Sequence, residues 1–164
     1  MTASVKAAVA LGSNLADPEA QVRAGFDELA ALPRTRLTAC SRLYRTAPVG
    51  YADQPAFVNA CALLETELAP RELLEGLLAI ENRHGRVRTV RNGPRTLDLD
   101  IVLYGDAASD EPRLTIPHPR AHERAFVLAP LVDVWPDAVI PGHGRAADCL
   151  ANVGEAGIER LGTS

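Results

Sequence analysis

The chain has 164 residues, a length that supports one sizeable hydrophobic core but not two ordinary domains. Apolar residues make up 47% and charged residues 23% of the chain, which is typical of a soluble globular protein. The net charge of −4 argues against a general nucleic-acid binder.

The predicted elements alternate between strands and helices along the chain. Pro18 is placed to open a first helix that ends by Pro33, and Pro70 is placed to open a second. The first helix buries a stripe at Val22, Phe26 and Leu29. The second places five apolar residues on one side: Leu73, Leu74, Leu77, Leu78 and Ile80. Strands are expected at residues 5–11, 35–45, 56–66 and 97–104.

The order of these elements is β-α-β-β-α-β, which predicts an α+β fold with a ferredoxin-like core. The sheet should be antiparallel or mixed, flanked by helices, and extended by further strands and helices. Two turn-rich segments, 46–55 and 84–95, are expected to be loops, and 117–136 to hold a loop and a short helix. We expect residues 1–164 to form a single domain.

Three cysteines and the N-terminal segment bear on the compartment. Cys40, Cys61 and Cys149 are far apart and match no metal-binding spacing, which favours buried free thiols in a reducing compartment. The apolar run at residues 7–11 is too short for a signal peptide or a membrane span. We therefore expect a cytoplasmic protein that does not act at a membrane.

The strand at 97–104 carries two carboxylates. Strict alternation assigns one face to four apolar residues, Leu97, Leu99, Ile101 and Leu103. The other face then carries Asp98, Asp100, Val102 and Tyr104. Two acids on one face fit a Mg²⁺-nucleotide site, because Mg²⁺ takes one or two carboxylates together with phosphate oxygens. The alternative is a solvated strand face with surface ion pairs.

Basic residues gather just before this strand. The cluster comprises Arg83, Arg86, Arg88, Arg91 and Arg95. In an acidic protein, such a concentration points to a small anionic ligand, and guanidinium groups match phosphate oxygens. The alternative is a solvated loop whose charges keep the protein soluble.

A third group mixes amide and aromatic side chains. Phe57 and Asn59 share a face of the strand at 56–66, and together they suit a flat heterocycle. The alternative makes Phe57 a core residue and Asn59 a polar residue at a strand end. His118 lies between two prolines, where a histidine is either structural or part of a site.

Several segments together resemble a known family. They are 11-LGSNL-15, 44-YRTAPVG-50, 54-QPAFVNA-60, 93-GPRTLDLDI-101, 116-IPHP-119 and 124-RAFVLAPL-131. In this order they are similar to the 6-hydroxymethyl-7,8-dihydropterin pyrophosphokinases of folate biosynthesis. The resemblance implies an ATP-dependent diphosphotransferase that converts ATP and this pterin to AMP and the pterin diphosphate. It implies small-molecule substrates and no nucleic-acid partner, and we expect a monomer.

The resemblance also implies a role for individual residues. Asp98 and Asp100 match ligands of two Mg²⁺ ions, and Arg86 and Arg95 join them as catalytic residues. Positions that match the ATP site are Glu81, Arg86, Arg88, Arg95, Ile101, Arg113, Thr115, His118 and Arg124. Positions that match the pterin site are Gly12, Thr46, Val49, Phe57, Asn59 and Phe126. Asn92 stands where relatives often carry tryptophan.

A second class of function stays open at this point. A non-catalytic ferredoxin-like module could bind a nucleotide or RNA as a regulator. The acidic net charge and the retained pair of aspartates argue against it.

Overall fold

The structure is a computed structural model that describes residues 4–13, 18–46, 57–84, 97–111, 114–154 and 158–161. Its strands are β1 (Val5–Ser13), β2 (Thr35–Cys40), β3 (Tyr44–Thr46), β4 (Phe57–Thr66), β5 (Asp98–Tyr104), β6 (Ser109–Glu111), β7 (Leu114–Ile116), β8 (Val139–Ile140), β9 (Gly144–Arg145) and β10 (Ile158–Arg160). Its helices are α1 (Pro18–Ala30), α2 (Pro70–Arg83), the 3₁₀ helix η1 (Ala121–Glu123), α3 (Ala125–Val134) and α4 (Ala146–Val153).

The main sheet has the predicted ferredoxin-like arrangement. Its strand order is β10-β3-β4-β1-β5, and β2 also pairs with β4. Every pairing among these strands is antiparallel. Strands β4 and β1 lie in the centre of the sheet, between β2 and β5. This is the strand order of a split βαβ fold.

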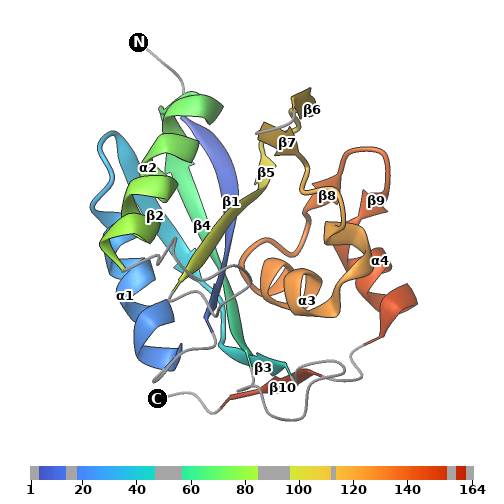
Figure 1. The fold of residues 1–164 in the computed structure, drawn as a ribbon. Helices are drawn as coiled ribbons and strands as arrows, with labels where there is room; N and C mark the ends of the chain where they lie inside the picture. The colour runs from blue at the N-terminus through green and yellow to red at the C-terminus, as the bar shows by residue number, and fades with distance from the viewer. Residues whose placement is uncertain are drawn as a thin grey trace.

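Helices cover both faces of this sheet (Figure 1). Helices α1 and α2 lie on one face, where the predicted stripe of Val22, Phe26 and Leu29 is buried. Helix α3 lies on the other face, with α4 packed beside it. In α2 the predicted stripe is narrower than expected, because Leu78 is 39% exposed. The α+β fold class is confirmed.

The expected strand at 35–45 is two strands. Both β2 and β3 pair with β4, but residues 41–43 interrupt the ladder. Ser41 exchanges two hydrogen bonds with Cys61 across the break: its N–H donates to the Cys61 carbonyl at 2.9 Å, and its Oγ accepts the Cys61 N–H at 2.8 Å. Because of this break, the single long strand β4 pairs with two shorter strands, β2 and β3.

The alternation predicted along 97–104 fails at its end. In the ladder with β1, Ile101 and Leu103 oppose consecutive residues, so Val102 is an extra residue that forms a β-bulge. Beyond the bulge the faces exchange. Leu103 packs with the α3 side, whereas Tyr104 packs against the α1 and α2 side and donates its hydroxyl to the Leu68 carbonyl. The predicted faces of Leu103 and Tyr104 were therefore wrong.

The remaining elements extend the core. The loop and short helix expected at 117–136 are confirmed by η1 and α3. The expected added strands and helices are the hairpins β6-β7 and β8-β9, helix α4 and strand β10, whose positions were not predicted. All three cysteines are free; Cys61 and Cys149 are buried as expected, but Cys40 is exposed. In the part of the chain that the structure describes, no helix is long and apolar enough to cross a membrane.

Candidate active site

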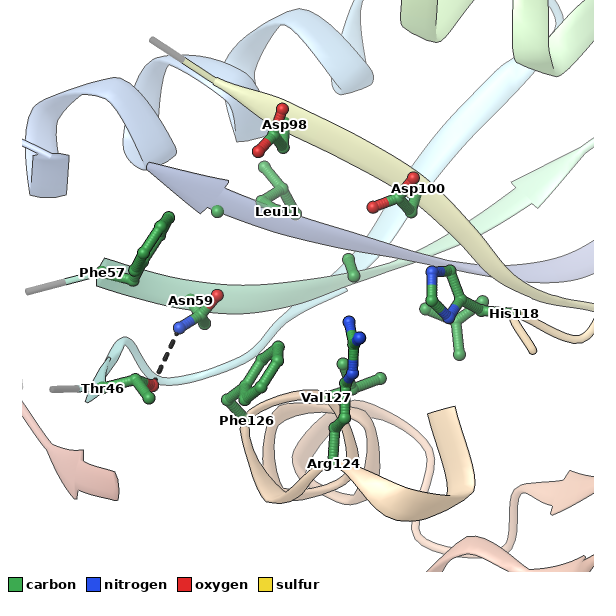
Figure 2. A pocket seen from close by; sticks show the side chains of 13 residues that line it. Leu11, Thr46, Phe57, Asn59, Asp98, Asp100, His118, Arg124, Phe126 and Val127 are labelled. Atoms are coloured by element: carbon green, nitrogen blue, oxygen red, sulfur yellow. Dashed lines mark hydrogen bonds between the residues drawn. The ribbon is translucent and has the colours of Figure 1, made fainter. Parts of the chain in front are cut away.

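A cavity of about 360 Å³ lies between the sheet and α3 (Figure 2). It brings together nine residues that the sequence singled out: Gly12, Thr46, Phe57, Asn59, Asp98, Asp100, His118, Arg124 and Phe126. They come from β1, β3, β4 and β5, from the segment between β7 and α3, and from α3 itself, so many of them are far apart in the sequence. The folded chain brings these residues together around one cavity.

One wall of the cavity is acidic. Asp98 and Asp100 project from the same side of β5, as Figure 2 shows, because successive strand residues alternate between faces. The residue between them, Leu99, is buried in the opposite core. Across the ladder the aspartates oppose Gly12 and Ala10, so the neighbouring strand β1 presents small residues at these two positions.

The opposite wall carries amide, hydroxyl and aromatic groups. Asn59 is 9% exposed, and its Nδ2 donates to the Thr46 Oγ1 at 2.9 Å. Phe57 on β4 and Phe126 on α3 both line the cavity beside this pair (Figure 2). A Cβ atom on Gly12 would lie 3.1 Å from the Asn59 Oδ1, so glycine leaves room for the amide.

Two nitrogen-bearing side chains line the cavity near the aspartates. The Arg124 guanidinium lies over the Phe126 ring, 5.6 Å from its centroid. Burial lowers the pKa of His118; the Asp100 carboxylate opposes this effect, and Arg124 adds to it. The His118 Nδ1 also accepts the backbone N–H of Arg120 at 3.3 Å, which requires a free lone pair on that nitrogen. Both observations favour a neutral imidazole.

A second cavity of about 230 Å³ adjoins the first. Asp100 and His118 line both cavities, so the two meet at these side chains. Besides His118, two further predicted nucleotide-site residues, Ile101 and Thr115, line the second cavity. Its other walls are mainly apolar: Leu74, Leu99, Leu114, Ile116 and Pro119.

Glu81 has a different position from the other predicted residues. It is 6% exposed, and its Oε2 accepts the N–H of Leu99 at 2.8 Å. It is not among the described residues that line either cavity. Its described contact therefore supports β5, the strand that carries both aspartates, from behind.

Five predicted site residues lie outside the described residues: Val49, Arg86, Arg88, Arg95 and Arg113. So does Asn92. The sequence reasoning gave no site role to four residues that line the first cavity, Ala10, Leu11, Val102 and Val127, although it placed Val102 on the strand face of the two aspartates. These small or aliphatic residues look like core positions in the sequence. Strand alternation from Gly12, which the resemblance assigns to the pterin site, would also have indicated Ala10.

The described cavity residues fit a Mg²⁺ site in which the protein supplies part of the ligand shell. They supply two hard carboxylate donors on one strand face, the number that Mg²⁺ usually takes when substrate phosphates complete its shell. Among the residues that the structure describes, no group of three or more His, Cys, Asp or Glu side chains could hold a metal alone. A metal bound here would need a ligand that brings further oxygens.

The fold and the paired cavities define an α+β protein of the ferredoxin-like class with adjoining sites for small molecules. The family model described as 7,8-dihydro-6-hydroxymethylpterin-pyrophosphokinase (HPPK) matches residues 8–136. The chain belongs to this family of pyrophosphokinases, which confirms the enzyme class expected from the sequence motifs.

Individual relatives agree with the family match. The chain is 54% identical over 153 residues to a protein of Pseudomonas aeruginosa, covering 93% of this chain and 94% of the relative. A relative in Haemophilus influenzae is 48% identical over 137 residues, with 84% of this chain and 86% of the relative covered. Both are named 2-amino-4-hydroxy-6-hydroxymethyldihydropteridine pyrophosphokinase.

Solved structures agree in fold. Wild-type HPPK-DHPS of Plasmodium falciparum matches with a TM-score of 0.74 at 12% sequence identity. The match covers 96% of this chain and 48% of the solved chain, so this chain spans about half the length of that protein. At this identity the similarity concerns the fold alone.

Proposed function

We propose that the protein transfers the β,γ-pyrophosphoryl group of ATP to 6-hydroxymethyl-7,8-dihydropterin in folate biosynthesis. The observation that carries this proposal is the junction of two cavities at Asp100 and His118. A transfer between two substrates needs two subsites that meet where the reacting groups lie. The pterin occupies the first cavity and the nucleotide the second.

The first cavity has the chemistry of a pterin subsite. A flat heterocycle placed between Phe57 and Phe126 gains stacking contacts on both faces. The Asn59 amide and the Thr46 hydroxyl lie at one edge of the same space and offer donors and acceptors to the ring. Gly12 permits close approach, and Val49 completes the edge contacts in this proposal.

The second cavity has the chemistry of a purine subsite. Its aliphatic walls suit a flat base, and the Thr115 hydroxyl supplies a polar contact. The phosphates extend from there toward the junction at His118, and Arg124 lines the first cavity beyond it. We assign further nucleotide contacts to Arg86, Arg88, Arg95, Ile101 and Arg113, whereas Glu81 acts on this site through β5, by accepting the N–H of Leu99.

Asp98 and Asp100 are proposed to hold two Mg²⁺ ions together with the triphosphate. When bound, the ions neutralise phosphate charge and align the two substrates. The protein itself would bind both substrates, orient the hydroxymethyl oxygen toward the β-phosphorus and exclude water from the junction. Arg86 and Arg95 stabilise the transferring group through guanidinium–phosphate contacts.

The bond changes balance without any further reactant. The hydroxymethyl oxygen forms a bond to the β-phosphorus, and the bond from that phosphorus to the α–β bridging oxygen breaks. AMP leaves with the bridging oxygen, and the hydroxyl proton is released. The products are AMP and the pterin diphosphate.

The nucleotide product tests this proposal directly. The protein is incubated with ATP, Mg²⁺ and the hydroxymethyl dihydropterin, and the nucleotides are separated by chromatography. AMP formed in equal amount to the pterin diphosphate is the expected result. ADP would mean transfer of a single phosphoryl group, and no product would favour a non-catalytic binding module; either outcome overturns the proposal.

A further inference from the structure

A hydrogen bond links α3 to the sheet beside the first cavity. Tyr44 on β3 is fully buried, and its hydroxyl donates to the Asp133 Oδ2 on α3 at 2.6 Å. The same oxygen accepts the backbone N–H of Arg42 at 3.4 Å. Neither Tyr44 nor Asp133 is among the described residues that line the cavity.

On the sheet side, this bond starts next to the amide wall of the cavity. Tyr44 is the cross-strand partner of Asn59, and Thr46 is the partner of Phe57. Residues two apart on a strand share a face, so Tyr44 and Thr46 project to the same side as Asn59 and Phe57. Tyr44 is therefore the next side chain in the row that forms this wall.

On the helix side, the bond ends at Asp133, which lies on nearly the same side of α3 as Phe126. Asp133 follows Phe126 by seven residues, which is close to two full turns and about 10 Å along the helix axis. Both side chains thus leave α3 on nearly the same side, toward the sheet. The bond to Asp133 fixes the C-terminal half of α3, while Phe126 extends from the N-terminal half into the cavity.

We infer that Tyr44 and Asp133 are a positioning pair that sets the separation between Phe126 on α3 and the wall formed by Phe57 and Asn59. This inference rests on the proposed function, because it assigns the pair to the pterin subsite. The second cavity contains no residue of β3, β4 or α3 among its described lining. Loss of the bond should accordingly weaken pterin binding much more than nucleotide binding, because the proposed nucleotide contact on α3, Arg124, lies at the helix N-cap, at the far end from Asp133.

The test compares Tyr44→Phe with Tyr104→Phe. Each substitution removes one tyrosine hydroxyl that donates a hydrogen bond, to Asp133 in one case and to the Leu68 carbonyl in the other. Tyr104 packs on the opposite face of the sheet, away from α3, and serves as the matched control. The dissociation constants for the pterin and for a non-hydrolysable ATP analogue with Mg²⁺ are measured by calorimetry.

Tyr44→Phe should raise the Kd for the pterin about five- to tenfold, the equivalent of one net hydrogen bond, with a much smaller change in the Kd for the ATP analogue. Asp133→Ala should have the same effect. Because Asp133 is exposed, this variant should fold and can test the pair even if Tyr44→Phe folds poorly. Asp133→Asn keeps an acceptor oxygen and should restore binding. The double variant of Tyr44→Phe and Asp133→Ala should be no worse than either single one.

The wild-type titration separates the two proposals. A wild-type protein that does not bind the pterin overturns the proposed function, and this inference with it. Normal pterin binding by Tyr44→Phe or Asp133→Ala, with only a lower melting temperature as in Tyr104→Phe, overturns this inference alone. Equal losses of pterin and nucleotide binding would also overturn it.

Discussion

His118 donates its backbone N–H to the carbonyl oxygen of Val102 at 3.2 Å, and Val102 is the extra residue of the β5 bulge. A bulge residue leaves the regular ladder, so its backbone groups are free to bond elsewhere. Here the bulge carbonyl holds the segment after β7 against the strand that carries Asp100. One irregularity of β5 thereby places the histidine at the junction of the two cavities.

The first prediction concerns pH. Since the pKa of His118 is lower in the folded protein than its ordinary value of about 6.5, the unfolded chain binds this proton more tightly. The free energy of unfolding should therefore fall as pH drops below about 6.5. His118→Gln removes this contribution, so its melting temperature should decrease less than that of the wild type between about pH 7.5 and about pH 5.

Thermal melts followed by circular dichroism at a series of pH values give the comparison. All other titrating groups are shared by the two proteins, so the difference between their pH profiles reports on His118. Parallel profiles would show that His118 has the same pKa in the folded and unfolded states, which would contradict a lowered pKa in the folded protein.

The second prediction concerns the carboxylates. Asp98→Asn and Asp100→Asn should each lower turnover on the order of 10²–10³-fold, a typical loss for a catalytic electrostatic contact. The fold should survive, because both side chains face the cavity rather than the core. AMP release at saturating substrates is measured alongside a circular dichroism melt.

Asp106→Asn is the matched control for this pair. Asp106 is exposed, follows the same strand and is not among the described cavity residues. Its turnover should equal that of the wild type. Near-normal turnover in a folded Asp98→Asn or Asp100→Asn protein would refute the metal assignment.

The third prediction concerns the pterin edge. Asn59→Ala removes the amide whose Nδ2 donates to Thr46, and should weaken pterin binding by about 1–3 kcal/mol, the cost of an unpaired polar group. Binding of an ATP analogue should stay unchanged, since Asn59 does not line the second cavity as described. Separate calorimetric titrations distinguish the two ligands.

Thr46→Ser is the control, because it retains the hydroxyl that accepts from Asn59. Its pterin affinity should remain within a small factor of the wild-type value. If Asn59→Ala lost both ligands to the same extent, the amide would be supporting the fold rather than the pterin subsite.

Much of the fold could be predicted because local patterns and burial agree. The stripe of Val22, Phe26 and Leu29 predicts one helix face, and each prediction was confirmed. The bulge at Val102 could not be predicted, because it depends on the register between β1 and β5. Within the sequence of β5 alone, continued alternation is equally reasonable.

The site divides in the same way. Charged and aromatic residues such as Asp98 and Phe126 carry chemistry that is visible in the sequence. Apart from Asp100, Thr115 and His118, the described walls of the second cavity are leucine, isoleucine and proline residues, and nothing in the sequence distinguishes these from core residues. Their role follows only from the packing of β5 against β7 and the nearby α2.

The last prediction concerns Glu81, whose buried carboxylate accepts the N–H of Leu99. Leu99 lies between Asp98 and Asp100, so this bond fixes the part of β5 that presents both carboxylates. Glu81→Ala leaves a buried donor without its acceptor and should lower the free energy of unfolding by about 1–3 kcal/mol. Glu81→Gln keeps an acceptor oxygen and should lose much less. Urea unfolding curves measure the stability of both variants. Folded Glu81→Ala should also turn over more slowly than the wild type, because β5 is no longer held in place behind the two aspartates. Equal stability of the wild type and Glu81→Ala would show that the bond does not support β5.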